Sequence, residues 1–153
     1  EISLGLVGSE MCIRDRCALI QYPDIFCAAS SSYGISDLKS LSQHTHKYEL
    51  HYTTTLMGGT YEDLPGVYKA RSALHHADKI RTPLLLLQGD QDRVVAPDQS
   101  RRMARAIESH AGKIKYIEFP SEGHGFRRSD TRKRALEEEF AWCNDAARIP
   151  EVC

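Results

Sequence analysis

Two apolar runs, each ending in a loop with a chemically capable side chain, constrain the fold of this chain most strongly. The first run covers residues 84–88 and is followed by G-D-Q-D-R-V-V-A-P; the second covers residues 114–119 and is followed by P-S-E-G-H-G-F. A helix-like segment separates the two runs. This succession is typical of parallel strands that are buried on both faces of a sheet. We therefore predict an α/β fold in which both runs are strands of one sheet.

The loops that follow the two predicted strands carry Asp92 and His124. Neighbouring strands lie about 4.8 Å apart, and the ligands of parallel sheets bind beyond the carboxyl ends of the strands. If the two runs are neighbours, both side chains leave the same edge of the sheet side by side. The sequence therefore predicts an Asp92–His124 pair at this edge.

Composition limits the class of protein. The length of 153 residues fits one domain, and the apolar content of 41% and the charged content of 27% are ordinary for a soluble globular protein. A formal charge of -1 gives no electrostatic reason to expect nucleic acid or an anionic membrane surface as a partner. The five cysteines are odd in number and lack C-x-x-C spacing, which argues for reduced thiols rather than disulfides or a zinc site.

Residues 1–16 fit poorly with the rest of the chain, because they show neither a strand alternation nor an amphipathic helix. The string V-G-S-E-M-C-I-R-D-R resembles translated sequencing-adapter read-through. We expect residues 1–16 to be non-native, residues 17–145 to form the domain, and residues 146–153 to be a tail. With the true N-terminus expected to be missing, the sequence favours a cytoplasmic location only weakly and leaves the compartment open.

The remaining elements follow in order. A helix is expected to end before Pro23, and a strand follows over residues 25–31, with Tyr33 near its carboxyl end as a pocket-lining or structural residue. Residues 37–59 are polar and loosely helical, and Gly58 and Gly59 suit a helix stop. In the closing helix Leu136, Phe140 and Cys143 fall at spacings of four and three, which predicts an apolar stripe on the sheet with Trp142 off it.

Several histidines raise the question of a metal. His44, His46 and His51 lie within one polar segment, but no carboxylate or cysteine stands with them at a recognisable ligand spacing. Solvated imidazoles are the simpler interpretation, and we predict no metal and no cofactor. The pair His75-His76 precedes the strand at residues 84–88, at its amino end, where packing or capping is expected.

The motifs taken together resemble the prolyl oligopeptidase family of serine peptidases. The resemblance is carried by H-A-D-K-I-R-T-P-L-L-L-L-Q-G, G-D-Q-D-R-V-V-A-P-D-Q and E-G-H-G-F, in this order with a helix and a strand between the last two. The segments Y-P-D-I-F-C-A-A and T-H-K-Y-E-L-H-Y are similar to the acylaminoacyl-peptidase-like and dipeptidyl-peptidase-like members. The match covers about residues 17–142, so we expect the C-terminal part of an α/β-hydrolase fold, a mostly parallel sheet of about three strands with flanking helices.

The resemblance also implies roles for two residues. The family has an α/β-hydrolase catalytic domain, usually preceded by a β-propeller, and a triad in the chain order Ser, Asp, His. Carried across, Asp92 is the orienting acid and His124 is the general base. Asp90 is the rival carboxylate, but the acid of the family stands three residues after the glycine, here Gly89, which points to Asp92.

The nucleophile departs from the family pattern. The motif G-x-S-x-G should lie shortly before Cys17, but Ser9 has Met11 where a glycine belongs. The other candidate serines, Ser30, Ser31, Ser32 and Ser121, also lack the pattern, and Cys17 has no glycine-rich elbow around it. We therefore expect an inactive fragment of a serine-type peptidase that acts on peptides. An esterase fragment and a noncatalytic α/β ligand-binding module remain the alternatives.

Overall fold

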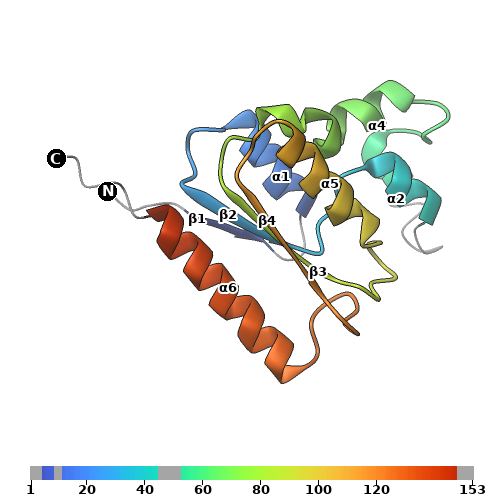
Figure 1. The fold of residues 1–153 in the computed structure, drawn as a ribbon. Coiled ribbons are helices and arrows are strands. Elements are labelled where there is room, and N and C mark those ends of the chain that lie inside the picture. The colour runs from blue at the N-terminus through green and yellow to red at the C-terminus, as the bar shows by residue number, and fades with distance from the viewer. Residues whose placement is uncertain (1–4, 9–11, 45–52, 148–153) are drawn as a thin grey trace.

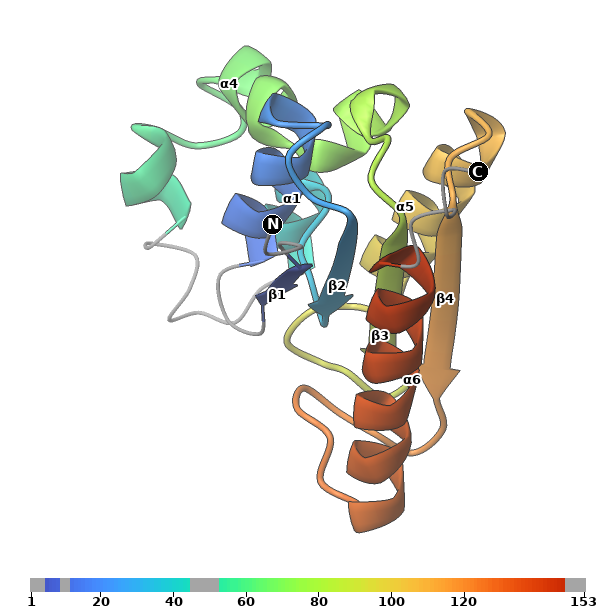
Figure 2. The same ribbon diagram turned by 90° about the vertical axis from the view of Figure 1, so that its left-hand side faces the viewer.

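The sheet is parallel throughout the part of the chain that the computed structural model describes, residues 5–8, 12–44 and 53–147. Within these ranges four strands pair in the order β1-β2-β3-β4, and Figure 2 shows them side by side. The strands are β1 (Gly5–Gly8), β2 (Ala28–Ser32), β3 (Leu84–Gly89) and β4 (Ile114–Phe119). The predicted parallel pairing of β3 with β4 is confirmed, with Leu84 opposite Ile114 and Gly89 opposite Phe119.

Helices cover both faces of the sheet (Figure 1). The helical segments are α1 (Cys12–Gln21), α2 (Leu38–His44), α4 (Pro65–Arg71), the 3-10 segment η1 (Ala73–Lys79), α5 (Asp98–Ser109) and α6 (Ser129–Ala147). Helices α1 and α5 lie on one face, and α6 covers the other face. No helix among the described residues combines the length and the apolar character that crossing a membrane requires.

Strand β3 is the centre of the core. Its four consecutive leucines are fully buried, and they alternate between two clusters because successive side chains of a strand point to opposite faces. Leu84 and Leu86 pack with the α1 and α5 layer, whereas Leu85 and Leu87 pack beneath α6. Full burial of one such side chain contributes about 1.5–3 kcal/mol. This explains why an uninterrupted apolar run, rather than an alternating one, forms the strand.

The order of the strands decides which of them is central. Strand β4 is an edge of the sheet formed by the described residues. The strand expected over residues 25–31 corresponds to β2, which lies between β1 and β3 and is buried along its whole length. The reason is β1, which lies in the segment expected to be non-native and pairs with β2 from Gly5 opposite Ala28 to Gly8 opposite Ser31.

Helix α6 presents a different face to the sheet from the one predicted. Leu136 and Phe140 are 66% and 76% exposed, whereas Ala135 and Trp142 pack on the leucines of β3. Residues 135, 139 and 142 repeat the spacing of four and three one position earlier in the chain. Polar contacts favour this face, because Ser30 donates a hydrogen bond of 2.7 Å to Glu139 and the Trp142 indole donates to the Pro83 carbonyl at 3.4 Å.

Two predicted helix ends are confirmed. Helix α1 ends at Gln21, just ahead of Pro23. Residues 53–57 are helical and stop at Gly58, whose φ of 86° lies in the left-handed region that glycine adopts without strain. The amides of Gly58 and Gly59 both donate to the Thr54 carbonyl at 3.0 Å, and these bonds close the last turn.

Candidate active site

Asp92 and His124 meet at the carboxyl edge of the sheet. Nδ1 of His124 lies 3.0 Å from Oδ2 of Asp92. Asp92 is in the loop after β3 and His124 is in the loop after β4, and these loops lie at the same end of the sheet (Figure 2). The contact predicted from the sequence is therefore present. It follows from the parallel pairing of two adjacent strands.

The Asp92 carboxylate is buried and accepts several hydrogen bonds. Oδ1 accepts from the backbone amides of Val94 and Val95, both at 2.9 Å, and Oδ2 accepts from Nε2 of Gln88 at 2.9 Å. Burial by itself raises the pKa of this carboxyl, but the hydrogen bonds from His124, Val95 and Val94 outweigh burial and lower the pKa below its ordinary value. Asp92 is consequently a carboxylate at neutral pH, as an orienting acid must be.

The rival carboxylate, Asp90, makes different contacts. Its side chain is exposed, and its Oδ1 accepts a hydrogen bond of 2.7 Å from the backbone amide of Ser121. The amide of Asp90 donates to the Phe119 carbonyl at 3.1 Å. Asp90 thus braces the turn that follows β4, while Asp92 contacts the imidazole.

The loop that carries His124 is fixed from both sides. A Cβ at Gly89 would lie 2.3 Å from the carbonyl oxygen of Glu122, so only glycine fits where the two loops cross. The Glu122 carbonyl also accepts the Gln91 amide at 2.9 Å. The Glu122 side chain is buried and accepts the amides of Arg127 and Arg128 at 2.9 and 3.1 Å. Burial opposes the charge of this carboxylate, but these amides help to lower its pKa.

Tyr33 covers the imidazole. Its ring centroid lies 5.2 Å from that of His124 and 4.8 Å from that of Phe126. Tyr33 has a φ of 52°, an unusual conformation for a bulky residue that costs of order 1–3 kcal/mol, and its amide donates to the Leu87 carbonyl at 2.9 Å. The structure therefore places the Tyr33 ring against His124 and Phe126, and both roles that the sequence left open stay predictions.

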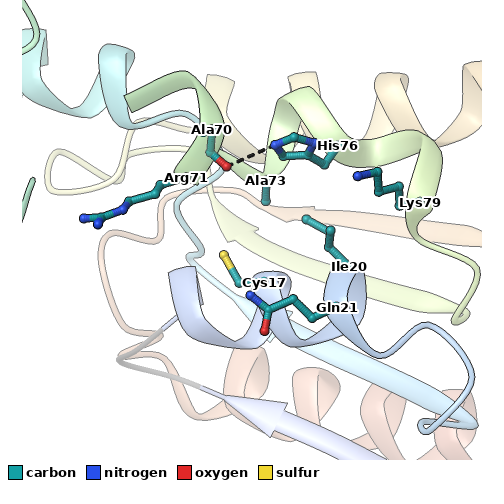
Figure 3. A pocket seen from close by; sticks show the side chains of 8 residues that line it. All are labelled: Cys17, Ile20, Gln21, Ala70, Arg71, Ala73, His76 and Lys79. Atoms are coloured by element: carbon teal, nitrogen blue, oxygen red, sulfur yellow. Dashed lines mark hydrogen bonds between the residues drawn. The ribbon is translucent and has the colours of Figure 1, made fainter. Parts of the chain in front are cut away.

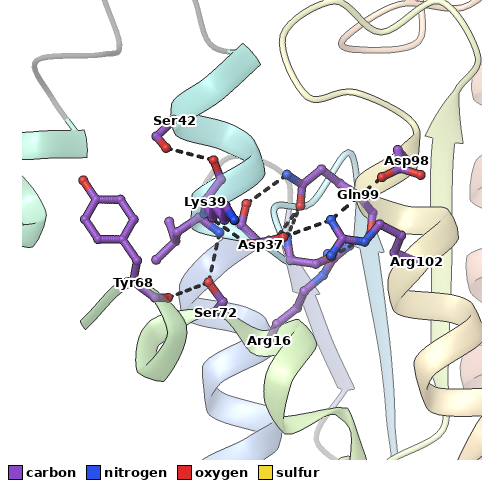
Figure 4. A network of polar contacts seen from close by, with 11 residues as sticks. Arg16, Asp37, Lys39, Ser42, Tyr68, Ser72, Asp98, Gln99 and Arg102 are labelled. Atoms are coloured by element: carbon purple, nitrogen blue, oxygen red, sulfur yellow. Dashed lines mark hydrogen bonds and ion pairs between the residues drawn. The ribbon is translucent and has the colours of Figure 1, made fainter. Parts of the chain in front are cut away.

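The loop after β2 is tied to α5, which begins shortly after the Asp92 loop (Figure 4). Oε1 of Gln99 accepts the backbone amides of Ser36 and Asp37 at 2.9 and 2.8 Å, and Arg102 contacts the Asp37 carboxylate at 2.9 Å. The buried guanidinium of Arg16 donates to the Ser36 hydroxyl. These bonds hold the ends of β2 and β3 in a fixed relation.

Two of the candidate nucleophiles, Ser30 and Cys17, have surroundings of their own. The hydroxyl of Ser30 donates to Glu139 on the α6 face. Burial raises the pKa of the Cys17 thiol, which disfavours the reactive thiolate. Ser9 lies outside the described residues.

A small cavity of about 140 Å³ lies between α1 and η1 (Figure 3). Cys17 and Ile20 line it from α1, and His76 and Lys79 line it from η1. The His76 ring contacts the Ala70 carbonyl at 3.0 Å, at the end of α4, in agreement with the expected capping role. No lining residue comes from the loops that carry Asp92 or His124, so this cavity is separate from the pair.

The histidines of the metal hypothesis fall outside what the structure describes. His46 and His51 are not among the described residues, and for His44 only the helical backbone is described. Among the described side chains, no group of three or more histidine, cysteine, aspartate or glutamate residues is arranged to hold a metal ion. The metal hypothesis therefore stays untested.

Sequence reasoning missed two residues of the site, Gln88 and Glu122. Both are fully buried and polar, and both contact the loops of the pair. A signal was available for Gln88, because a polar residue that closes a run of four leucines is unusual in a strand buried on both faces.

The fold and the site define an α/β-hydrolase: a parallel sheet, flanking helices, and an Asp-His pair on the loops after adjacent strands. The chain belongs to the prolyl oligopeptidase family, whose model matches residues 16–149. The matching family is one of peptidases.

Curated relatives include peptidases and an esterase. Dipeptidyl aminopeptidase BIII of Pseudoxanthomonas mexicana is 32% identical over 115 residues, which cover 72% of this chain and 17% of the relative. Esterase LipQ of Mycobacterium tuberculosis is 30% identical over 101 residues, covering 65% of this chain and 24% of the relative. This chain spans about a fifth of the length of such relatives.

Solved structures agree with this assignment. A puromycin-hydrolysing peptidase of Mycobacterium tuberculosis superposes with a TM-score of 0.86 at 38% identity, over 95% of this chain and 22% of that chain. A puromycin hydrolase superposes with the same TM-score at 33% identity, over 96% of this chain and 23% of that chain.

The lowered pKa of Asp92 predicts a dependence of stability on acid. A carboxyl whose pKa is lower in the folded state stabilises the fold above its unfolded pKa, and this contribution is lost as the pH falls through the folded pKa. We expect urea unfolding to show a larger loss of stability between pH 7 and pH 3 for the natural chain than for Asp92→Asn, which cannot titrate here. Equal losses in the two proteins would contradict a lowered Asp92 pKa.

Proposed function

We propose that this chain supplies the acid–base half of a serine-type peptidase that cleaves peptides by acyl transfer. Asp92 is the orienting acid and His124 is the general base. The observation that carries this proposal is the 3.0 Å contact between Nδ1 of His124 and Oδ2 of a buried, ionised Asp92. The 36% exposure of the His124 side chain supports it, because a substrate must be able to reach the ring.

The chemistry follows from the proton on Nδ1. When Nδ1–H donates to Asp92, Nε2 of the neutral ring keeps its lone pair and can take the proton of a serine hydroxyl as that oxygen attacks the scissile carbonyl. The imidazolium then gives this proton to the leaving amine, and the Asp92 carboxylate stabilises the intermediate charge. An ester would follow the same steps with an alcohol as the leaving group.

The nucleophile is the part of the reaction that this sequence does not supply in the family pattern. The printed sequence contains no G-x-S-x-G motif. We propose that the chain as given does not hydrolyse substrates, and that serine and oxyanion hole belong to the rest of the parent enzyme. The parent would also carry further domains, among them a β-propeller. The length of the solved relatives supports the expectation of further domains, since the chain covers 22% of the mycobacterial peptidase.

A chemical label tests whether the chain as given is inert. We expect a fluorophosphonate probe to label no serine of the purified chain, and an activated ester to give no burst, because the sequence lacks the G-x-S-x-G elbow that aligns a serine hydroxyl with the base. Mass spectrometry of the probe-treated chain provides the measurement. Stoichiometric labelling of any serine would show that a nucleophile is present.

A chimera tests whether the pair is competent. Residues 16–149 would replace the aligned segment of the mycobacterial puromycin-hydrolysing peptidase, so that the host supplies its own preceding residues and this chain supplies Asp92 and His124. We expect the chimera to hydrolyse the host substrate and to react with the fluorophosphonate. A chimera that melts cooperatively but shows no turnover above the uncatalysed rate would contradict the proposal.

Esterase activity is the second candidate, favoured by the 30% identity to esterase LipQ. The Asp-His pair serves both reactions, so the leaving group distinguishes them. In the parent enzyme, kcat/KM for a peptide amide and for the matching ester would be compared. A parent that cleaves the ester and leaves the amide intact would be an esterase.

A further inference from the structure

Gln88 is a fully buried amide at the end of β3, next to the Asp92 loop. Its Nε2 donates to Oδ2 of Asp92 at 2.9 Å and to the carbonyl of Val95 at 3.3 Å. Its Oε1 accepts the hydroxyl of Ser100, also fully buried, at 2.9 Å. An amide buried without partners costs of order 1–3 kcal/mol, so these bonds are what make glutamine tolerable in a leucine strand.

The surroundings fix which end of the amide faces Asp92. The Val95 carbonyl can only accept a hydrogen bond, and the Asp92 carboxylate can only accept as well. The NH₂ end of Gln88 must therefore face both of them, and the Ser100 hydroxyl must donate to the oxygen at the other end. The donors of Ser100 and Gln88 thus point in series toward the Asp92 carboxylate.

We propose that Gln88 is a positioning residue that holds the Asp92 carboxylate in the rotation at which Oδ2 faces Nδ1 of His124. The amides of Val94 and Val95 fix Oδ1, and Gln88 donates to Oδ2, the same oxygen that Nδ1 of His124 contacts. The Gln88 amide bonds Asp92, Val95 and Ser100, so its effect on His124 is exerted through Asp92. A role of Gln88 in catalysis rests on the proposed function. Its role in orienting Asp92 toward His124 does not depend on that function.

The position of the proton on the neutral imidazole is the consequence that can be measured. A correctly rotated Asp92 carboxylate favours the Nδ1–H form, which leaves Nε2 free as the base. If Gln88 only fills space in the core, its replacement changes the melting temperature and leaves the proton where it was. The Nδ1–H to Nε2–H ratio therefore separates positioning from packing.

The experiment measures that ratio for His124 by ¹⁵N chemical shifts in the full chain, at a pH where the ring is neutral. Gln88→Leu removes both donors and keeps an apolar side chain of similar size. We expect the ratio to fall by about tenfold, the factor carried by one hydrogen bond to a charged group, toward the ratio of the exposed His110. Gln88→Met keeps an unbranched side chain of similar length but loses the amide donors, and the same fall is expected.

Gln99 offers a matched control. It is also a buried glutamine with an extended set of hydrogen bonds, but its partners are Ser36 and Asp37 rather than the catalytic pair (Figure 4). Gln99→Leu is expected to lower the melting temperature and to leave the His124 ratio within about twofold of the natural chain. Ser100→Ala should shift the ratio less than Gln88→Leu, because the Gln88 amide still faces Asp92 and loses only the hydrogen bond from Ser100.

The outcomes are distinct. An unchanged ratio in folded Gln88→Leu or Gln88→Met would overturn the inference. If neither variant folds, Ser100→Ala decides: a ratio shifted in the same direction supports positioning, and an unchanged ratio contradicts it. Failure of the proposed function has another signature. The ratio would respond to Gln88, yet the folded chimera with its native pair would not turn over substrate.

Discussion

Replacement of His124 by alanine in the chimeric peptidase is expected to lower kcat about a thousandfold or more, with KM changed much less. In the proposed mechanism the ring takes the serine proton and returns it to the leaving amine, and both transfers belong to transition states rather than to the bound substrate. Steady-state kinetics on the host substrate would measure the change. Residual turnover would come from substrate binding and the oxyanion hole of the host.

Controls for this variant come from the same chain. Asp92→Asn removes the ionised partner of the ring and is expected to cost a comparable factor, because an amide in that position can present a donor to Nδ1. His110→Ala, at an exposed histidine, and Asp90→Asn, in the rival carboxylate, should keep kcat within about threefold. A chimera in which His124→Ala behaves like His110→Ala would exclude His124 as the base.

Among the glycine-to-alanine substitutions, Gly89→Ala is expected to lower the stability of the fold most. The new Cβ would lie 2.3 Å from the Glu122 carbonyl oxygen and 2.7 Å from the Gly123 carbonyl oxygen, and both are backbone atoms. Backbone cannot rotate aside as a side chain can, so the loop that carries His124 must move. We expect destabilisation of about 3 kcal/mol or more, at the upper end of overpacking effects. Thermal unfolding followed by circular dichroism would measure it.

Gly66→Ala is the matched control. Gly66 lies in the first turn of α4, and a Cβ there meets nothing within 4 Å. Alanine should therefore leave the free energy of unfolding unchanged or raise it by up to about 1 kcal/mol through its better helix propensity. Equal melting temperatures for Gly89→Ala and Gly66→Ala would show that the two loops are not packed as closely as described.

The part of the site that could be predicted from the sequence is local in the chain. The pairing of β3 with β4 follows from two apolar runs joined by one helix, and the position of Asp92 and His124 follows from the ends of those runs. The G-x-x-D spacing separated Asp92 from Asp90, and the structure shows the two carboxylates with different partners. The pairing and the common edge need only the strand period and the rule that parallel strands end on one edge, whereas the choice of Asp92 over Asp90 came from the family resemblance.

Other features could not be predicted because they depend on contacts between distant segments. The apolar spacing in α6 fits two adjacent faces equally well, and Ser30 and Pro83, far away in the sequence, favour the face with Glu139 and Trp142. The central place of β2 depends on the pairing with β1, a short backbone match without a sequence pattern of its own. The periodicity of a segment shows where its apolar residues recur, but it does not show which other segment packs against them.

The sequence by itself determined the fold class, the family resemblance and the contact between Asp92 and His124, because strand ends and short motifs are written in consecutive residues. Only the tertiary structure decided how the pair is held. Gln88 and Ser100 orient Asp92, Glu122 and Gly89 fix the His124 loop, and Tyr33 covers the ring. These are buried polar bonds and close approaches between segments up to 91 positions apart, from Tyr33 to His124. Their energies depend on burial and distance, which exist only once the chain has folded.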